Sequence, residues 1–148
     1  MTTLIGSEII SVLIGRQIVT QAISDASNSI YNSITGIVFY SEDVNLILSE
    51  LDLGSKLQVL EELLKNLTNY KKKNSIIDIS LEHLHDMMLK IKRDINIISD
   101  KLEQHKNKWF NSYRKVNCKK ELLQLKKHSR ILNERLELFF KAFNLTIS

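Results

Sequence analysis

The stretch that decides the fold is residues 76–113, which read IIDISLEHLHDMMLKIKRDINIISDKLEQHKNKWFNSY. Its apolar side chains recur in alternating steps of four and three residues, a heptad spacing that places one apolar stripe along a single helix. No Pro or Gly interrupts it, and at 1.5 Å per residue the helix would be roughly 55 Å long. Because so long a stripe needs partners of similar length, the sequence predicts an elongated helical bundle. The stripe comprises Ile77, Leu81, Leu84, Met88, Ile91, Ile95, Ile98, Leu102, His105 and Trp109.

The first half of the chain also has helical patterns. Residues 4–39 keep near-heptad apolar spacing, with mostly uncharged polar residues on the other faces. A break is expected at Phe39–Ser41, where Ser41 suits an N-cap. The second helix then begins near Glu42. We expect it to break near Gly54, because Gly favours the residue after a helix end and Ser55 can cap the helix that follows.

Two further caps complete the prediction. Ser75 is expected to cap the long helix and Asn117 the last helix, which folds back on the long one through a short link. We therefore predict one all-α domain over residues 1–148, an elongated antiparallel four-helix bundle with the second helix broken near Gly54. The predicted core comprises Leu81, Leu84, Met88, Ile91, Ile95, Ile98, Leu102, Trp109, Leu132, Leu136 and Phe139.

The composition supports long helices and reveals a charge asymmetry. The 148 residues include no Pro and four Gly, too few turn formers for a sandwich or barrel. Residues 1–70 hold three Lys or Arg against eight Asp or Glu, whereas residues 71–148 hold eighteen against nine. Two interpretations remain open. The acidic half packs beside the basic half, or a basic surface faces an acidic partner.

Cysteine usage and the N-terminus indicate an intracellular protein. The single cysteine, Cys118, forms no intramolecular disulfide. The first apolar run lacks a basic start and is interrupted by Glu8 and Arg16, so we expect no secretory signal.

No motif predicts an enzyme, a cofactor or a small-molecule substrate. His83 and His85 point about 200° apart on a helix, so with Asp86 they do not form a metal site. Cys118 lies among Lys115, Lys119 and Lys120, which favour a lowered pKa, but no elbow motif or Gly-rich loop accompanies it and we expect an inert thiol. No Gly-rich phosphate loop is present.

Two basic segments are candidates for contact with a partner or an anionic surface. The first is the loop at Lys71, Lys72 and Lys73. The second interleaves cations with aromatics, as single-stranded nucleic acid binders do, although Trp109 also fits the helix stripe. The candidate contact residues are Lys71, Lys72, Lys73, Lys108, Arg114, Lys115, Lys119 and Lys120, and nucleic-acid binding would add Lys106.

The weakly polar first helix raises membrane insertion as an alternative. Residues 4–23 have the length of a membrane span, but Glu8 and Arg16 make spanning costly. An amphipathic helix that inserts into anionic membranes remains open. Its inserting side chains would be Ile5, Ile9, Val12 and Val19.

The chain contains the segments Glu50-Leu51-Asp52-Leu53, Lys108-Trp109-Phe110, Ser112-Tyr113-Arg114 and Asn117-Cys118. Together these segments resemble small all-helical proteins of nucleocytoplasmic large DNA viruses. The resemblance spans roughly residues 45–143 and implies a virus-encoded helical bundle that acts through its surfaces, with no catalytic residue to carry over. The bundle architecture is also similar to HeLo-type cell-death bundles, in architecture alone. For a virus-encoded protein, an intracellular location would be the host cytoplasm or the virion.

The leading hypothesis is a non-enzymatic structural protein that binds protein partners, or other copies of itself, through exposed helix faces. The first alternative is a membrane-active bundle whose N-terminal helix inserts into anionic membranes. The second is nucleic-acid binding by the basic C-terminal half.

Overall fold

The computed structural model describes residues 2–37, 42–107 and 117–147. Every regular element in these ranges is an α-helix, and none of them contains a strand. The all-α prediction is therefore confirmed for the described part of the chain. The helices are α1 (Thr2–Ile37), α2 (Glu42–Leu51), α3 (Leu53–Leu67), α4 (Ser75–Asn107) and α5 (Lys119–Ile147).

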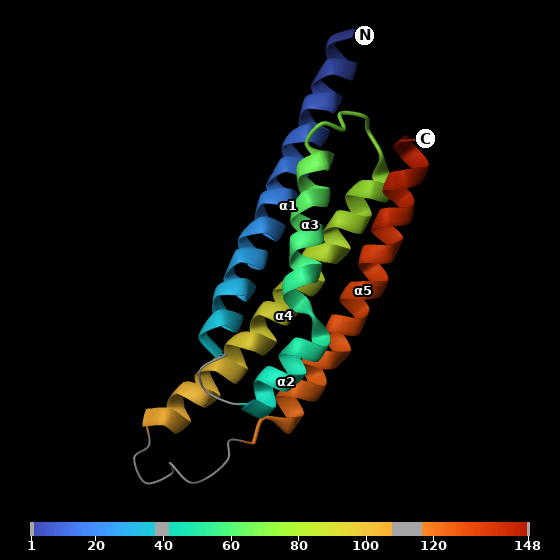
Figure 1. The fold of residues 1–148 in the computed structure, drawn as a ribbon. Helices are drawn as coiled ribbons and strands as arrows, with labels where there is room; N and C mark the ends of the chain where they lie inside the picture. The colour runs from blue at the N-terminus through green and yellow to red at the C-terminus, as the bar shows by residue number, and fades with distance from the viewer. Residues whose placement is uncertain (1, 38–41, 108–116, 148) are drawn as a thin grey trace.

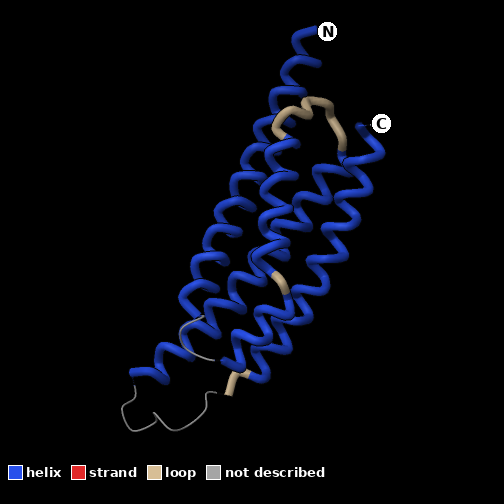
Figure 2. The backbone as a smooth tube through the Cα atoms, in the orientation of Figure 1, coloured by secondary structure: helices blue, strands red, loops and turns tan. Residues whose placement is uncertain are grey.

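The long helices lie side by side and give the molecule an elongated shape (Figure 1). Helix α4 packs lengthwise against both α1 and α5, while α3 contacts α1 and α2 contacts α5. The loop between α3 and α4 is at the same end of the molecule as both chain termini. Figure 2 shows how little of the described chain is loop. With 33 residues, α4 is about 50 Å long.

The predicted apolar stripe is the buried side of α4. Its first eight residues are all at most 3% exposed, which confirms that part of the heptad assignment. His105 is partly buried, and Trp109 lies outside the described residues. The stripe is wider than predicted, because Met87 and the charged Asp94 are buried as well. The buried stripe residues are Ile77, Leu81, Leu84, Met88, Ile91, Ile95, Ile98 and Leu102.

The neighbouring helices supply the rest of the core. On α1, Ile23, Ala26, Ile30 and Ile37 are buried. On α5, Leu125, Leu132 and Phe139 are fully buried, whereas Leu136 only packs against the core from its edge. The break expected at Phe39–Ser41 falls on residues 38–41, outside the described residues.

The second helix breaks two residues earlier than predicted. Asp52 separates α2 from α3 in the left-handed conformation, with φ 50° and ψ 41°, while Gly54 lies inside α3 and has no positive φ. The predicted break near Gly54 is therefore confirmed, whereas the helix end at Gly54 itself and the cap at Ser55 are wrong. Lys56 Nζ instead donates to the carbonyl of Leu51 at 2.5 Å, at the C-terminal end of α2. Burial lowers the pKa of Lys56, and the charge of Asp52 offsets part of that fall.

Of the two caps predicted for the last two helices, one is wrong and one is confirmed. Asn74, not Ser75, caps α4, because its Oδ1 accepts the N–H groups of Ile76 and Ile77 at 3.1 and 3.2 Å. Asn117 Oδ1 accepts the N–H of Lys119 at 3.2 Å, as expected of a residue that caps α5. These caps satisfy N–H groups that a helix leaves unpaired.

Candidate functional site

The outer face of α5 carries a dense group of cations, which we call the basic face. Five exposed cations occupy its first three turns, and none forms an ion pair or side-chain hydrogen bond with a described residue. The nearby Glu121 is occupied by Lys101 of α4, whose hydrogen bond lowers the pKa of that carboxyl. Positive charge therefore accumulates on this face, and the charge of Glu121 offsets part of that of Lys120. Its residues are Lys119, Lys120, Lys126, Lys127 and Arg130.

The position of two of these cations is electrostatically unfavourable. Lys119 and Lys120 lie in the first turn of α5, where the partial positive charge of the helix N-terminus repels cations. Sequence reasoning predicted these two lysines as contact residues but missed Lys126, Lys127 and Arg130. The missed signal is their spacing, because steps of seven and eleven residues from Lys119 return to the same side of a helix.

The other predicted contact residues do not join the basic face. Lys71, Lys72 and Lys73 are exposed in the loop before α4, at the end of the molecule opposite to the start of α5 (Figure 1). Lys108, Arg114 and Lys115 lie outside the described residues, and the side chain of Lys106 is not described.

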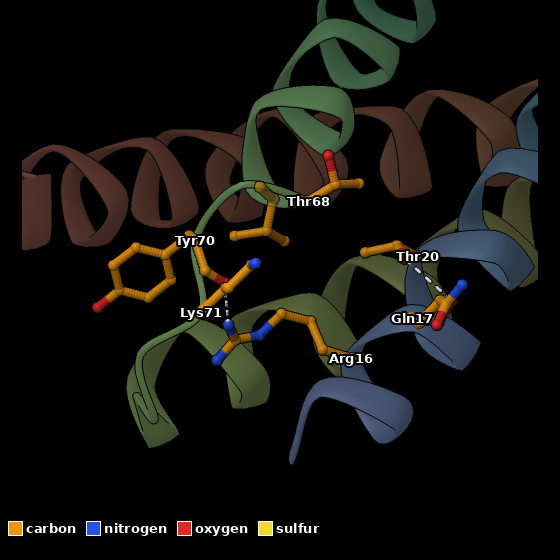
Figure 3. A pocket seen from close by; sticks show the side chains of 7 residues that line it. Arg16, Gln17, Thr20, Thr68, Tyr70 and Lys71 are labelled. Atoms are coloured by element: carbon orange, nitrogen blue, oxygen red, sulfur yellow. Dashed lines mark hydrogen bonds between the residues drawn. The ribbon is translucent and has the colours of Figure 1, made fainter. Parts of the chain in front are cut away.

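The lysine loop borders a cavity of about 260 Å³ (Figure 3). Arg16, Gln17 and Thr20 of α1 line one side, and Thr68 and Lys71 lie on the other. Its two threonine hydroxyls are already engaged, since Thr20 donates to the Gln17 carbonyl and Thr68 to the Lys65 carbonyl.

Arg16 connects several segments at the end of the molecule where the lysine loop lies. Its guanidinium donates to Asp78 Oδ1 at 2.8 Å, to the Tyr70 carbonyl at 2.8 Å and to the Lys72 carbonyl at 3.0 Å. It also lies 5.4 Å from the centre of the Tyr70 ring, within reach of a cation–π contact. The arginine that interrupts the first apolar run therefore joins α1 to the loop and to α4.

A second polar contact joins α4 to α5. His128 Nδ1 lies 2.5 Å from Asp94 Oδ2, and Gln124 lies 3.2 Å from the other ring nitrogen. Asp94 is only 7% exposed, so the pair satisfies a carboxylate that burial would otherwise penalise.

Cys118 and the histidines of α4 show no reactive arrangement. Cys118 is buried, and burial raises the pKa of its thiol, contrary to the lowering expected from nearby lysines. The described residues contain no group of three or more side chains able to hold a metal. Asp86 contacts Lys90 at 3.2 Å and Arg135 at 3.5 Å.

The candidate insertion residues lie along α1. Val19 is partly buried and packs against the core. Ile5, Ile9 and Val12 belong to the same helix, but their side chains are not described. Among the described residues, no helix combines the length and the apolar character needed to cross a membrane.

Comparison with known proteins yields a viral relative. No protein-family model and no solved structure matches the chain. The uncharacterized protein L717 of Acanthamoeba polyphaga mimivirus is 30% identical to it over 150 residues, which cover 83% of the chain and 70% of that protein. This similarity supports the link to nucleocytoplasmic large DNA viruses. None of the three comparisons bears on the likeness to HeLo-type bundles.

Proposed function

We propose that this chain, which belongs to the same family as the mimivirus protein L717, is a non-enzymatic structural protein of viral type that self-associates through an exposed helix face. In this proposal the helices form an elongated antiparallel four-helix bundle that acts inside the cell or the virion. The observation that supports it is a group of exposed apolar side chains on the outer sides of α4 and α5, which we call the apolar band. The band consists of Ile76 and Ile79 on α4 and Leu138 on α5.

The alignment of α4 with α5 determines which exposed residues of the two helices lie at the same level. Lys101 contacts Glu121, Asp94 contacts His128, and Arg135 donates to the His83 carbonyl at 2.7 Å. Residue numbers fall along α4 as they rise along α5, so these two helices run antiparallel.

One turn beyond the His83–Arg135 contact, the outer positions become apolar. Ile79 precedes His83 by one turn and Leu138 follows Arg135 by one turn, so the two side chains lie at the same level of the antiparallel pair. Ile79 is 52% and Leu138 63% exposed, and Ile76 one turn further along is 64% exposed. Clustered apolar groups exposed to this degree mark interaction sites more often than isolated ones do.

A second copy is the partner that best fits this band. The nearby positions of both helices carry both signs of charge: Asp86 lies 3.5 Å from Arg135, and Glu134 and Lys141 are exposed on α5. A rim of mixed sign lets two copies face each other without net repulsion. The apolar side chains cover only part of the ~800 Å² per partner that a stable interface buries, so we expect a weak dimer.

Sedimentation velocity across a range of protein concentrations tests self-association. The double variant Ile79→Ser/Leu138→Ser should remain monomeric where the wild type dimerises. Ile14→Ser/Ile18→Ser is a matched control, because these α1 side chains are 53% and 65% exposed and lie outside the band. A monomeric wild type at all concentrations, or equal loss of dimer in both variants, would contradict the proposal.

A further inference from the structure

The basic face of α5 has a different chemistry from the apolar band and calls for a different partner. Lys119, Lys126 and Arg130 follow one another at intervals of seven and four residues, so they lie in a row along the helix. From residue 119 to residue 130 the row is about 16 Å long. Lys120 and Lys127 flank it, giving five cations on one exposed surface.

The rest of α5 restricts how this surface can act. Its apolar side is occupied, because Leu122, Leu125 and Leu132 are at most 7% exposed in the core. An interfacial helix binds a membrane by burying its apolar side among lipids. Helix α5 cannot do so while it remains in the bundle, and Leu123 is the one large apolar side chain among the described residues 119–130 that is exposed.

We infer that the basic face binds the phosphate backbone of nucleic acid. Double-stranded DNA carries one negative charge per about 1.7 Å of axis, and a row of cations on a rigid helix complements such a uniform line of charge. Four of the five cations are lysines, which act as point charges and not as bidentate readers of bases. Binding should therefore be independent of nucleotide sequence.

The inference does not depend on self-association. The basic face lies on the first three turns of α5, whereas the apolar band begins beyond Arg135. A protein that remains monomeric can still bind nucleic acid, and one that dimerises can fail to do so. The two experiments therefore have separate outcomes.

Fluorescence anisotropy with the full chain and a labelled duplex of arbitrary sequence tests the inference. If all five cations contact phosphates, raising the salt from 50 to 200 mM should weaken binding on the order of 500-fold. In the variant Lys126→Gln/Lys127→Gln/Arg130→Gln, two contacts remain and the same change should weaken binding only about 12-fold. Circular dichroism verifies that the variant is folded.

The control removes the same charge from elsewhere. Lys71→Gln/Lys72→Gln/Lys73→Gln loses three exposed cations from the loop at the other end of the bundle, and it should retain the steep salt dependence. Equal loss in both triple variants would overturn the inference, since net charge would then explain binding. Failure to bind any duplex would overturn it as well. So would preferential binding to phosphatidylserine vesicles or to polyglutamate, which would assign the face to a membrane or an acidic protein.

Discussion

At the scale of single residues, Arg16 shows how a buried charge stabilises one end of the bundle. Its side chain is 4% exposed and bonded to a carboxylate and two carbonyls. Buried charge is costly unless it is paired and fully hydrogen-bonded. The sequence shows Arg16 only as an interruption of an apolar run, because its partners lie 54 to 62 residues away. No local pattern reveals that contact.

Replacing Arg16 should therefore be costly. Arg16→Met leaves Asp78 and two carbonyls without their donor, and we expect a loss of about 3 kcal/mol in the free energy of unfolding. Arg16→Lys should recover little of it, since one ammonium does not reproduce the planar fork of donors. Urea unfolding provides the measurement, with Arg93→Met at an exposed position of α4 as the control. Equal stability of the two methionine variants would show that the buried contacts contribute nothing.

Titration of Cys118 should make the stability of the protein depend on pH, and burial of the thiol determines the sign. Its pKa is raised above the ordinary value of 9.0, chiefly by burial, so the folded state favours the neutral thiol. The corresponding stability is complete below that ordinary pKa and is lost as the pH rises through the raised folded value. Wild type should lose more stability in alkaline buffer than Cys118→Ala does, measured by urea unfolding at neutral and alkaline pH. Identical losses would mean that the thiol titrates alike in both states.

At the scale of elements, the break between α2 and α3 results from the spacing of buried leucines. Leu48 and Leu53 are five residues apart and both buried. In a continuous helix that step would rotate the second side chain about 140° away from the first. The left-handed conformation at Asp52 restores the alignment, so that Leu53 and Leu57 face the same core. Turn preference alone favoured Gly54, whereas the leucine spacing places the break between Leu48 and Leu53.

The break should respond specifically to side-chain shape at residue 52. Asp52→Val places a β-branched side chain in the left-handed region and should cost about 1–2 kcal/mol of stability. Asp52→Gly should cost little, because glycine adopts this conformation without strain. Thermal unfolding of the two variants measures the difference. A valine variant as stable as the glycine variant would mean that the conformation at residue 52 changes with the substitution.

The candidate site could be predicted less completely than the helices. Heptad spacing reveals buried stripes because each helix carries its own pattern. The basic face could be predicted only in part. Lys119 and Lys120 are adjacent in the sequence and were predicted, whereas Lys126, Lys127 and Arg130 lie beside them only once the helix has formed. The apolar band depends on the register between α4 and α5, set by Arg135, His83 and Asp94. That register is a tertiary property, and neither helix encodes it alone.

At the scale of the whole molecule, the central stripe of α4 is what the other helices assemble around. Ile95 of α4 is 0% exposed, whereas Ile97 on the same helix is 42% exposed. Ile95→Asp buries an unpaired carboxylate at a cost of several kcal/mol, comparable with the whole stability of a domain this size. We expect Ile95→Asp to be unfolded or insoluble and Ile97→Asp to fold, as measured by circular dichroism and urea unfolding. Because both variants carry the same new charge on the same helix, a difference between them isolates burial. A soluble, fully helical Ile95→Asp protein would contradict the packing of α4, and with it the register on which the apolar band depends.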